Sequence, residues 1–146
     1  MEPALSAAPV ERLVGRPVVT WHDLRRLGFR LDSHGVDNQP HMVCSVHPNQ
    51  EVGLEIAPAI TPRGTWTIWL RSDMAHSRCR FCFLRHVTFV DELVGLIEAI
   101  QGRPVIDVEY DRDVFEQSLA REMEEAKRRY AEYCADARWG RIPGGL

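Results

Sequence analysis

Two stretches, EVGLEI (residues 51–56) and WTIWLR (residues 66–71), decide the fold of this chain. In both, every second side chain is apolar, a period that is typical of half-buried β-strands. Successive side chains of a strand point to opposite faces of the sheet, so the pattern predicts which ones face the core. The inward-facing set is Val52, Leu54, Ile56, Trp66, Ile68 and Leu70.

Other stretches around this pair also have strand character. Residues 29–34 and 41–47 flank a GVDN turn at 35–38, which is a hairpin signal. Residues 79–87 are rich in aromatic and β-branched side chains, and residues 105–110 are the candidate for a further strand.

Helix signals stand at both ends of this strand-rich region. Thr20 and Asp23 form a capping-box pair that predicts a short helix over 21–27. Thr88 and Asp91 repeat the Thr-x-x-acid spacing and predict the start of a second helix.

A third, long helix is predicted from Asp111 to about Trp139. Asp111 belongs to an alternating acidic group (residues 107–113), for which a solvated face and a helix cap are favoured over a cation site. Apolar side chains then recur every three or four residues, at Phe115, Leu119, Met123, Ala126, Tyr130 and Tyr133. This stripe approaches a heptad and permits a homodimer through the helix, although packing on its own sheet is favoured.

Strands followed by helices predict an α+β fold. We expect a mainly antiparallel sheet of about five or six strands, with a short N-terminal helix and two C-terminal helices packed on one face. Residues 1–16 are predicted to be a flexible lead, residues 17–139 a single α+β domain and residues 140–146 a tail.

Composition narrows the class of protein. The chain has 146 residues, 45% of them hydrophobic, and no apolar run near the roughly 20 residues of a membrane-spanning helix, so no membrane partner is expected. No secretory signal is recognisable at the N-terminus, and four irregularly spaced cysteines predict reduced thiols in a cytoplasm. Small accessory proteins of bacteria or phages have this combination of length, composition and cysteine content.

Charge is divided unevenly along the chain. Residues 1–87 carry ten basic and eight acidic side chains and all six histidines, whereas residues 88–146 carry eight basic and thirteen acidic side chains. The first part is therefore a weak candidate for binding nucleic acid and the second part a poor one.

Two ligand-like spacings, Cys44-x-x-His47 and Cys79-x-x-Cys82, suit one tetrahedral zinc ion. With four protein ligands this zinc would be structural, and it would support a zinc-stabilised nucleic-acid-binding module. In a flat meander, however, the second and fifth strands lie three inter-strand steps apart, roughly 14 Å. Buried structural thiols without a cofactor are therefore favoured.

Enzymatic chemistry has little support in the sequence. A Cys/His-dependent enzyme would use Cys44, Cys79 or Cys82 as nucleophile with a histidine base, but no nucleophile signature is present. Phosphate-binding glycine motifs are also missing from the sequence. A catalytic site is therefore not predicted.

The favoured function is that of a non-enzymatic regulatory protein, accessory or inhibitory, that acts by protein–protein interaction. Its surface would combine the open face of the sheet with the C-terminal helix, because Trp, Tyr and Arg dominate binding hot spots. Aromatic side chains and arginines on a sheet can also bind single-stranded nucleic acid by stacking on its bases. Because this surface carries both acidic and basic side chains, nucleic acid is the less favoured partner. The predicted contact residues are Trp69, Arg71, Arg30, Arg85, His34, Tyr130, Tyr133 and Trp139.

Overall fold

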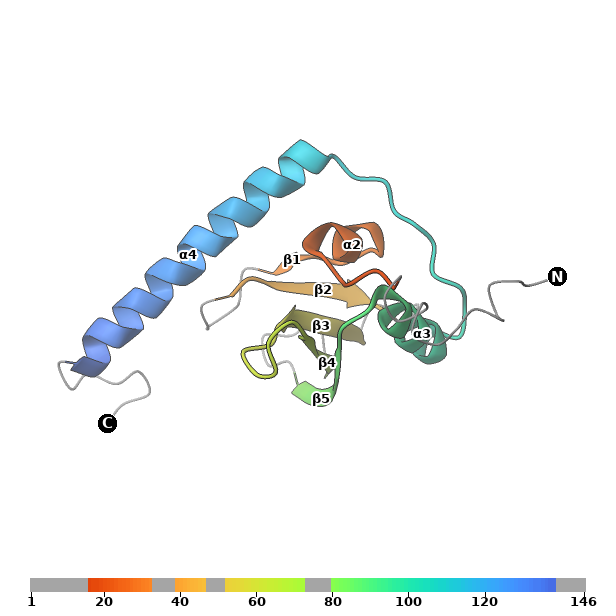
Figure 1. The fold of residues 1–146 in the computed structure, drawn as a ribbon, viewed down its shortest axis with the longest axis horizontal. Helices are drawn as coiled ribbons and strands as arrows, with labels where there is room; N and C mark the ends of the chain where they lie inside the picture. The colour runs from red at the N-terminus through yellow and green to blue at the C-terminus, as the bar shows by residue number, and fades with distance from the viewer. Residues whose placement is uncertain (1–15, 33–38, 47–51, 73–79, 139–146) are drawn as a thin grey trace.

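The part of the chain that the structure describes folds as an α+β protein with a five-stranded antiparallel sheet and three helices (Figure 1). The computed structural model describes residues 16–32, 39–46, 52–72 and 80–138. The strands, which lie in the sheet in chain order, are β1 (Arg30–Asp32), β2 (His41–Ser45), β3 (Gly53–Pro58), β4 (Trp66–Ser72) and β5 (Arg80–Val87). The helices are α2 (Trp21–Arg26), α3 (Val90–Gln101) and α4 (Arg112–Arg138).

The alternation in β3 and β4 sets the core as predicted. Leu54, Ile56 and Ile68 are fully buried, and Ile56 pairs directly with Ile68 across the two strands. They pack in one cluster with Leu24 of α2 and Leu93 of α3. Each fully buried aliphatic side chain stabilises the fold by about 2 kcal/mol, so this layer fixes which face of the sheet carries the helices.

The N-terminal helix begins at the predicted cap. Thr20 Oγ1 accepts a hydrogen bond from the Asp23 amide at 3.2 Å, and Asp23 Oδ2 accepts one from the Thr20 amide at 3.0 Å. Gly28 follows the helix with a φ of 102°, a left-handed conformation that side chains with a Cβ rarely adopt. The chain can therefore turn directly from α2 into β1.

The second helix, α3, begins one residue later than predicted. Its cap residue is Phe89, and Glu92 Oε1 accepts hydrogen bonds from the backbone amides of Thr88 and Phe89, both at 3.0 Å. Asp91 instead forms an ion pair with Arg16 at 2.6 Å. The predicted Thr88–Asp91 cap is wrong because the adjacent acidic residue reaches the free amides.

The long helix α4 is capped by Asp111, whose Oδ1 accepts a hydrogen bond from the Val114 amide at 3.1 Å. Its apolar stripe is buried at Phe115 and at Ala126, whereas Tyr130 and Tyr133 are each 49% exposed. Figure 1 shows α4 on the β1 side of the sheet, at the opposite side from β5. The stripe therefore leaves its last two aromatic side chains accessible.

Residues 105–110 do not form the further strand that the sequence suggested. They run in an extended connection between α3 and α4, outside the sheet. The Val108 amide donates to the carbonyl of Arg26 at 2.7 Å, which ties this connection to the end of α2.

Candidate functional site

The sheet face away from α2 and α3 carries a buried ionic network. Glu55 on β3 is its centre: Oε2 shares a hydrogen bond with His41 Nδ1 at 2.6 Å, and Oε1 pairs with Arg71 Nη1 at 3.0 Å. The same Arg71 nitrogen also pairs with Asp32 Oδ2 at 2.8 Å. His41, Glu55 and Arg71 are only 9%, 7% and 8% exposed, so this region of the face is closed to solvent.

The network shows that the sheet is curled. Asp32 lies on β1 and Arg71 on β4, with two strands between them. In a flat sheet three inter-strand steps alone cover roughly 14 Å, and the register offsets the two residues along the strands as well. A strongly twisted and curled sheet brings the two side chains together, and β1 thereby bends toward this face.

Trp69 borders the network on the same face. Its ring stacks on His41 with centroids 5.6 Å apart and an interplanar angle of 9°. Trp69 is partly buried, whereas its neighbour Ile68 is fully buried on the helix side. The inward and outward assignments for this strand are therefore those that the alternation predicted.

The exposed part of this face lies on β5. Phe83 pairs with Trp69 and Phe81 with Arg71, and directly paired side chains share a face. Phe81 and Phe83 are 54% and 53% exposed. The Phe83 ring also lies 5.2 Å from the ring of His86. We call Trp69, Phe81, Phe83 and His86 the aromatic patch.

Arg71 links the patch to the buried network, because its guanidinium lies 5.6 Å from the centre of the Phe81 ring. Such a cation–π contact favours one position of the ring. The buried ionic cluster thus supports part of the exposed aromatic surface from beneath.

The predicted contact residues fall in several places. Trp69 and Arg71 lie together, but Arg71 is buried against two carboxylates and has little surface to offer a partner. Arg30 on β1 is exposed on this face, because it pairs with Val43, which pairs with Glu55. Arg85 on β5 is exposed on the opposite face, because it pairs with the buried Ile68, and it forms an ion pair with Glu92 of α3 at 3.1 Å.

The remaining predicted contacts lie apart from this face. Tyr130 and Tyr133 are half-exposed on the last turns of α4, outside the sheet. His34 and Trp139 lie outside the described residues.

Two members of the predicted zinc set, Cys44 and Cys82, are described, and three inter-strand steps separate them in the sheet. Cys44 pairs with Leu54, which pairs with Leu70, and Leu70 in turn pairs with Cys82. The two cysteines therefore lie at opposite ends of one row of paired residues, which crosses the sheet from β2 to β5. His47 and Cys79 lie outside the described residues, and among the residues that are described no three potential ligands group to hold a metal ion. The zinc site stays a prediction.

Burial determines the chemistry of Cys44. It raises the pKa of this thiol to about 12, mainly by desolvation, so the thiol is protonated at neutral pH. A protonated thiol is a poor nucleophile. Cys82, by contrast, is exposed on β5.

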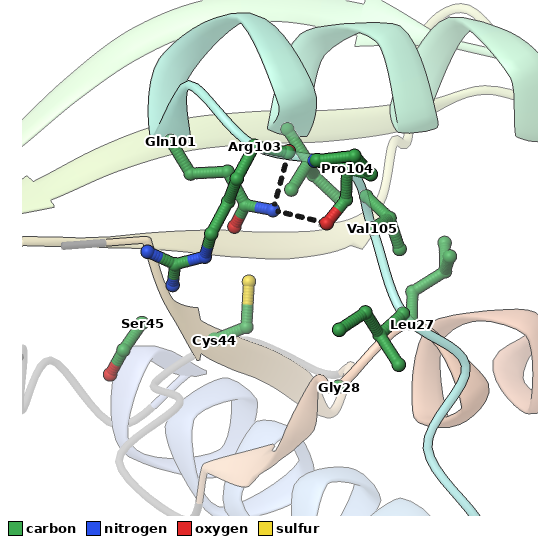
Figure 2. A pocket seen from close by; sticks show the side chains of 10 residues that line it. Leu27, Gly28, Cys44, Ser45, Gln101, Arg103, Pro104 and Val105 are labelled. Carbon is green, nitrogen blue, oxygen red and sulfur yellow. Dashed lines mark hydrogen bonds between the residues drawn. The ribbon is translucent and has the colours of Figure 1, made fainter. Parts of the chain in front are cut away.

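Cys44 also points into a small cavity of about 200 Å³ (Figure 2). The cavity lies between the end of α2, β2 and the segment that follows α3, where Gln101 Nε2 donates to the carbonyl oxygens of Arg103 and Pro104. Its described lining residues include no histidine and no carboxylate. None of the described lining residues can therefore act as a general base for Cys44. The Cys/His-dependent enzyme stays an alternative prediction.

No family model, no curated protein and no solved structure matches this chain. None of the helices in the described part of the chain is long and apolar enough to cross a membrane.

Sequence reasoning missed Phe81 and Phe83. Their F-x-F spacing places both on one face of a strand, and this signal is visible in the sequence. Which face they share depends on the pairing of Phe83 with Trp69, and only the sheet register supplies that information.

Proposed function

We propose that this protein is a non-enzymatic regulatory protein that binds another protein through the aromatic patch. The observation that carries the proposal is the pair of half-exposed phenylalanines, Phe81 and Phe83, beside Trp69 on one sheet face. Adjacent exposed aromatic side chains with a polar surround mark interaction sites more often than idle surface.

The surroundings of the patch support this use. The ionic network of Asp32, Glu55 and Arg71 holds the curled sheet beneath it, so the aromatic side chains are presented on a rigid strand pair. A preorganised surface loses less conformational entropy on binding than a mobile one. The patch therefore suits docking of a folded or extended protein partner.

Affinity capture from a lysate of the source organism tests the proposal. The native chain and Ile106→Ser, which removes a 77% exposed apolar side chain elsewhere, should enrich the same protein. Phe81→Ser combined with Phe83→Ser should lose it, and direct binding of the purified partner should weaken at least tenfold. A partner retained by the double variant contradicts the proposal.

Single-stranded nucleic acid is the alternative occupant, because aromatic side chains on a sheet can stack on bases. Binding of an oligonucleotide that needs Phe81 and Phe83 and weakens steeply with salt would replace the protein partner. Stoichiometric zinc in the purified protein, with a melting temperature lowered by a chelator, would favour the zinc-stabilised module.

The last turns of α4 offer a separate surface. Tyr130 and Tyr133 continue the apolar stripe of α4, whose earlier members are buried within the chain. Because these two side chains are half-exposed, we propose a homodimer through this helix as a second candidate interaction. Sedimentation equilibrium of the native chain and of Tyr130→Ser with Tyr133→Ser tests it. A dimer that persists in this variant contradicts dimerisation through α4.

A further inference from the structure

β5 forms one edge of the sheet that the structure describes. It pairs with β4 on one side, and no other described strand pairs with its outer side. The opposite edge strand, β1, has only three residues and lies beside α2 and the first turns of α4 (Figure 1). β5 has eight residues, and the four residues from Arg80 to Phe83 are all exposed. Alternate backbone N–H and C=O groups of an edge strand point outward and can pair with another strand.

The length of the usable edge is limited at its C-terminal end. The register between β4 and β5 shifts at Ile68 and Trp69, so Leu84 is an extra residue on the β5 side. A bulge bends the edge and interrupts regular pairing. Beyond β5, the Val19 amide donates to the Thr88 carbonyl at 3.0 Å and ties down the continuation of the strand. The accessible ladder is therefore centred on Arg80–Phe83.

The side chains along this ladder favour a particular kind of added strand. Phe81 and Phe83 would lie beside the side chains of an adjacent strand on the open face, where aromatic and β-branched cross-strand neighbours are stabilising. The charge on this ladder is basic: Arg80 is exposed, and β5 has no acidic residue. Arg85 lies beyond the bulge and is paired with Glu92, so it does not contribute.

Charge decides between a second copy and a different protein. An antiparallel pairing of two β5 strands over residues 80–83 would bring the Arg80 side chains of both copies onto one short ladder with no acidic residue between them, and like charges on neighbouring strands are destabilising. An extended segment with acidic side chains meets the opposite charge instead.

We propose that β5 accepts, by strand addition, an extended segment of another protein that carries apolar side chains at alternate positions and acidic residues at the end beside Arg80. This inference rests on the proposed function and adds the binding mode and the chemistry of the partner. The backbone of the segment pairs with Arg80–Phe83, and its apolar side chains lie beside Phe81 and Phe83.

Peptides selected from a displayed library of random ten-residue sequences against the full chain provide the probe. We expect acidic sequences with alternating apolar residues, whose binding weakens at least tenfold with Phe81→Ser and Phe83→Ser and several-fold with Arg80→Gln.

Each selected peptide is then made in two forms, N-methylated at odd or at even positions. One form should bind at least tenfold more weakly and the other nearly normally, because alternate amides of an added strand face its neighbour. Hydrogen exchange of the amides in 80–83 should slow on binding.

The outcomes separate the two proposals. Peptides that need Phe81 and Phe83 but tolerate both N-methylation patterns overturn strand addition and leave the aromatic patch as a docking site. A selection that yields only peptides indifferent to both phenylalanines contradicts the patch as well. A dimer that is lost in Phe81→Ser with Phe83→Ser would make a second copy the occupant and overturn the choice of partner.

Discussion

Arg71 on β4 and Asp32 on β1 form an ion pair, with Nη1 2.8 Å from Oδ2, although β2 and β3 lie between their strands. Both side chains are largely buried, and the same guanidinium also pairs with Glu55. The contact joins the first and fourth strands across the curled face. It therefore links the shape of the sheet to the position of Trp69 and the phenylalanines on β5.

Removing the cation of this network should destabilise the protein strongly. Arg71→Met leaves the carboxylates of Asp32 and Glu55 buried without this partner, which costs about 3 kcal/mol. Urea denaturation monitored by tryptophan fluorescence measures the loss. Adding Glu55→Gln to Arg71→Met should recover part of it, because one buried charge is then removed.

An exposed arginine supplies the matched control. Arg128 pairs with Glu125 and Glu132 on the solvent side of α4. Arg128→Met should leave the free energy of unfolding nearly unchanged, since exposed ion pairs contribute little. Equal losses for Arg71→Met and Arg128→Met would contradict a buried structural role for the network.

The cap of α3 should make stability depend on acid pH. Hydrogen bonds from the backbone amide of Thr88 and then of Phe89 lower the pKa of Glu92, with the Arg85 guanidinium adding to the effect. A carboxyl whose pKa is lower in the folded state stabilises the fold above its unfolded pKa, near 4.3, and this contribution is lost as pH falls through the folded pKa. Glu92→Gln should therefore cost about 1 kcal/mol at pH 7 and progressively less below about pH 4.

Urea denaturation of the native chain and Glu92→Gln between pH 3 and pH 7 measures this difference. Glu109→Gln, which removes an exposed carboxylate from the connection before α4, is the control and should show a small difference with little pH dependence. If the difference in free energy of unfolding between Glu92→Gln and the native chain stays constant from pH 3 to pH 7, the charge of Glu92 at the cap has no role.

The cysteines should differ sharply in reactivity. With a pKa of about 12, Cys44 has a thiolate fraction at pH 8 on the order of a thousandfold below that of an ordinary exposed thiol. Iodoacetamide at pH 8 should modify Cys82 and Cys134, which are exposed, while Cys44 reacts only after unfolding. Peptide mass spectrometry of timed samples follows each site. Rapid labelling of Cys44 in the folded protein would contradict the burial of its side chain.

The first turns of α4 should be held by Phe115. Its ring is 5% exposed and lies 5.3 Å from His22 and 5.7 Å from Tyr110 in edge-to-face contacts. Phe115→Ala should cost about 3 kcal/mol, with hydrogen exchange accelerated in α4 more than in β3 and β4. Tyr133→Ala, at a half-exposed position, should change stability by less than about 0.5 kcal/mol. Uniform acceleration over the whole chain would show that α4 does not open separately.

Much of the architecture is readable from the sequence because it depends on local periodicity. The alternation around Ile68 and Trp69 predicted both the strand and its inward side, and the Thr20–Asp23 pair predicted where α2 begins. The cap of α3 was misplaced by one residue, because Asp91 and Glu92 are adjacent acidic residues and only their contacts distinguish them.

The candidate site depended on information that periodicity does not contain. Alternation put Glu55 and Arg71 on the outer face but could not show that β1 curls toward them and closes that region. Likewise, F-x-F put Phe81 and Phe83 on one face, whereas the register with β4 made it the open one. The sequence by itself determined the α+β class, the core rows and the beginning of α2, since these follow from interactions between near neighbours. Tertiary structure alone decided which outward side chains are buried and which are exposed, because curl and register are set by contacts between distant strands.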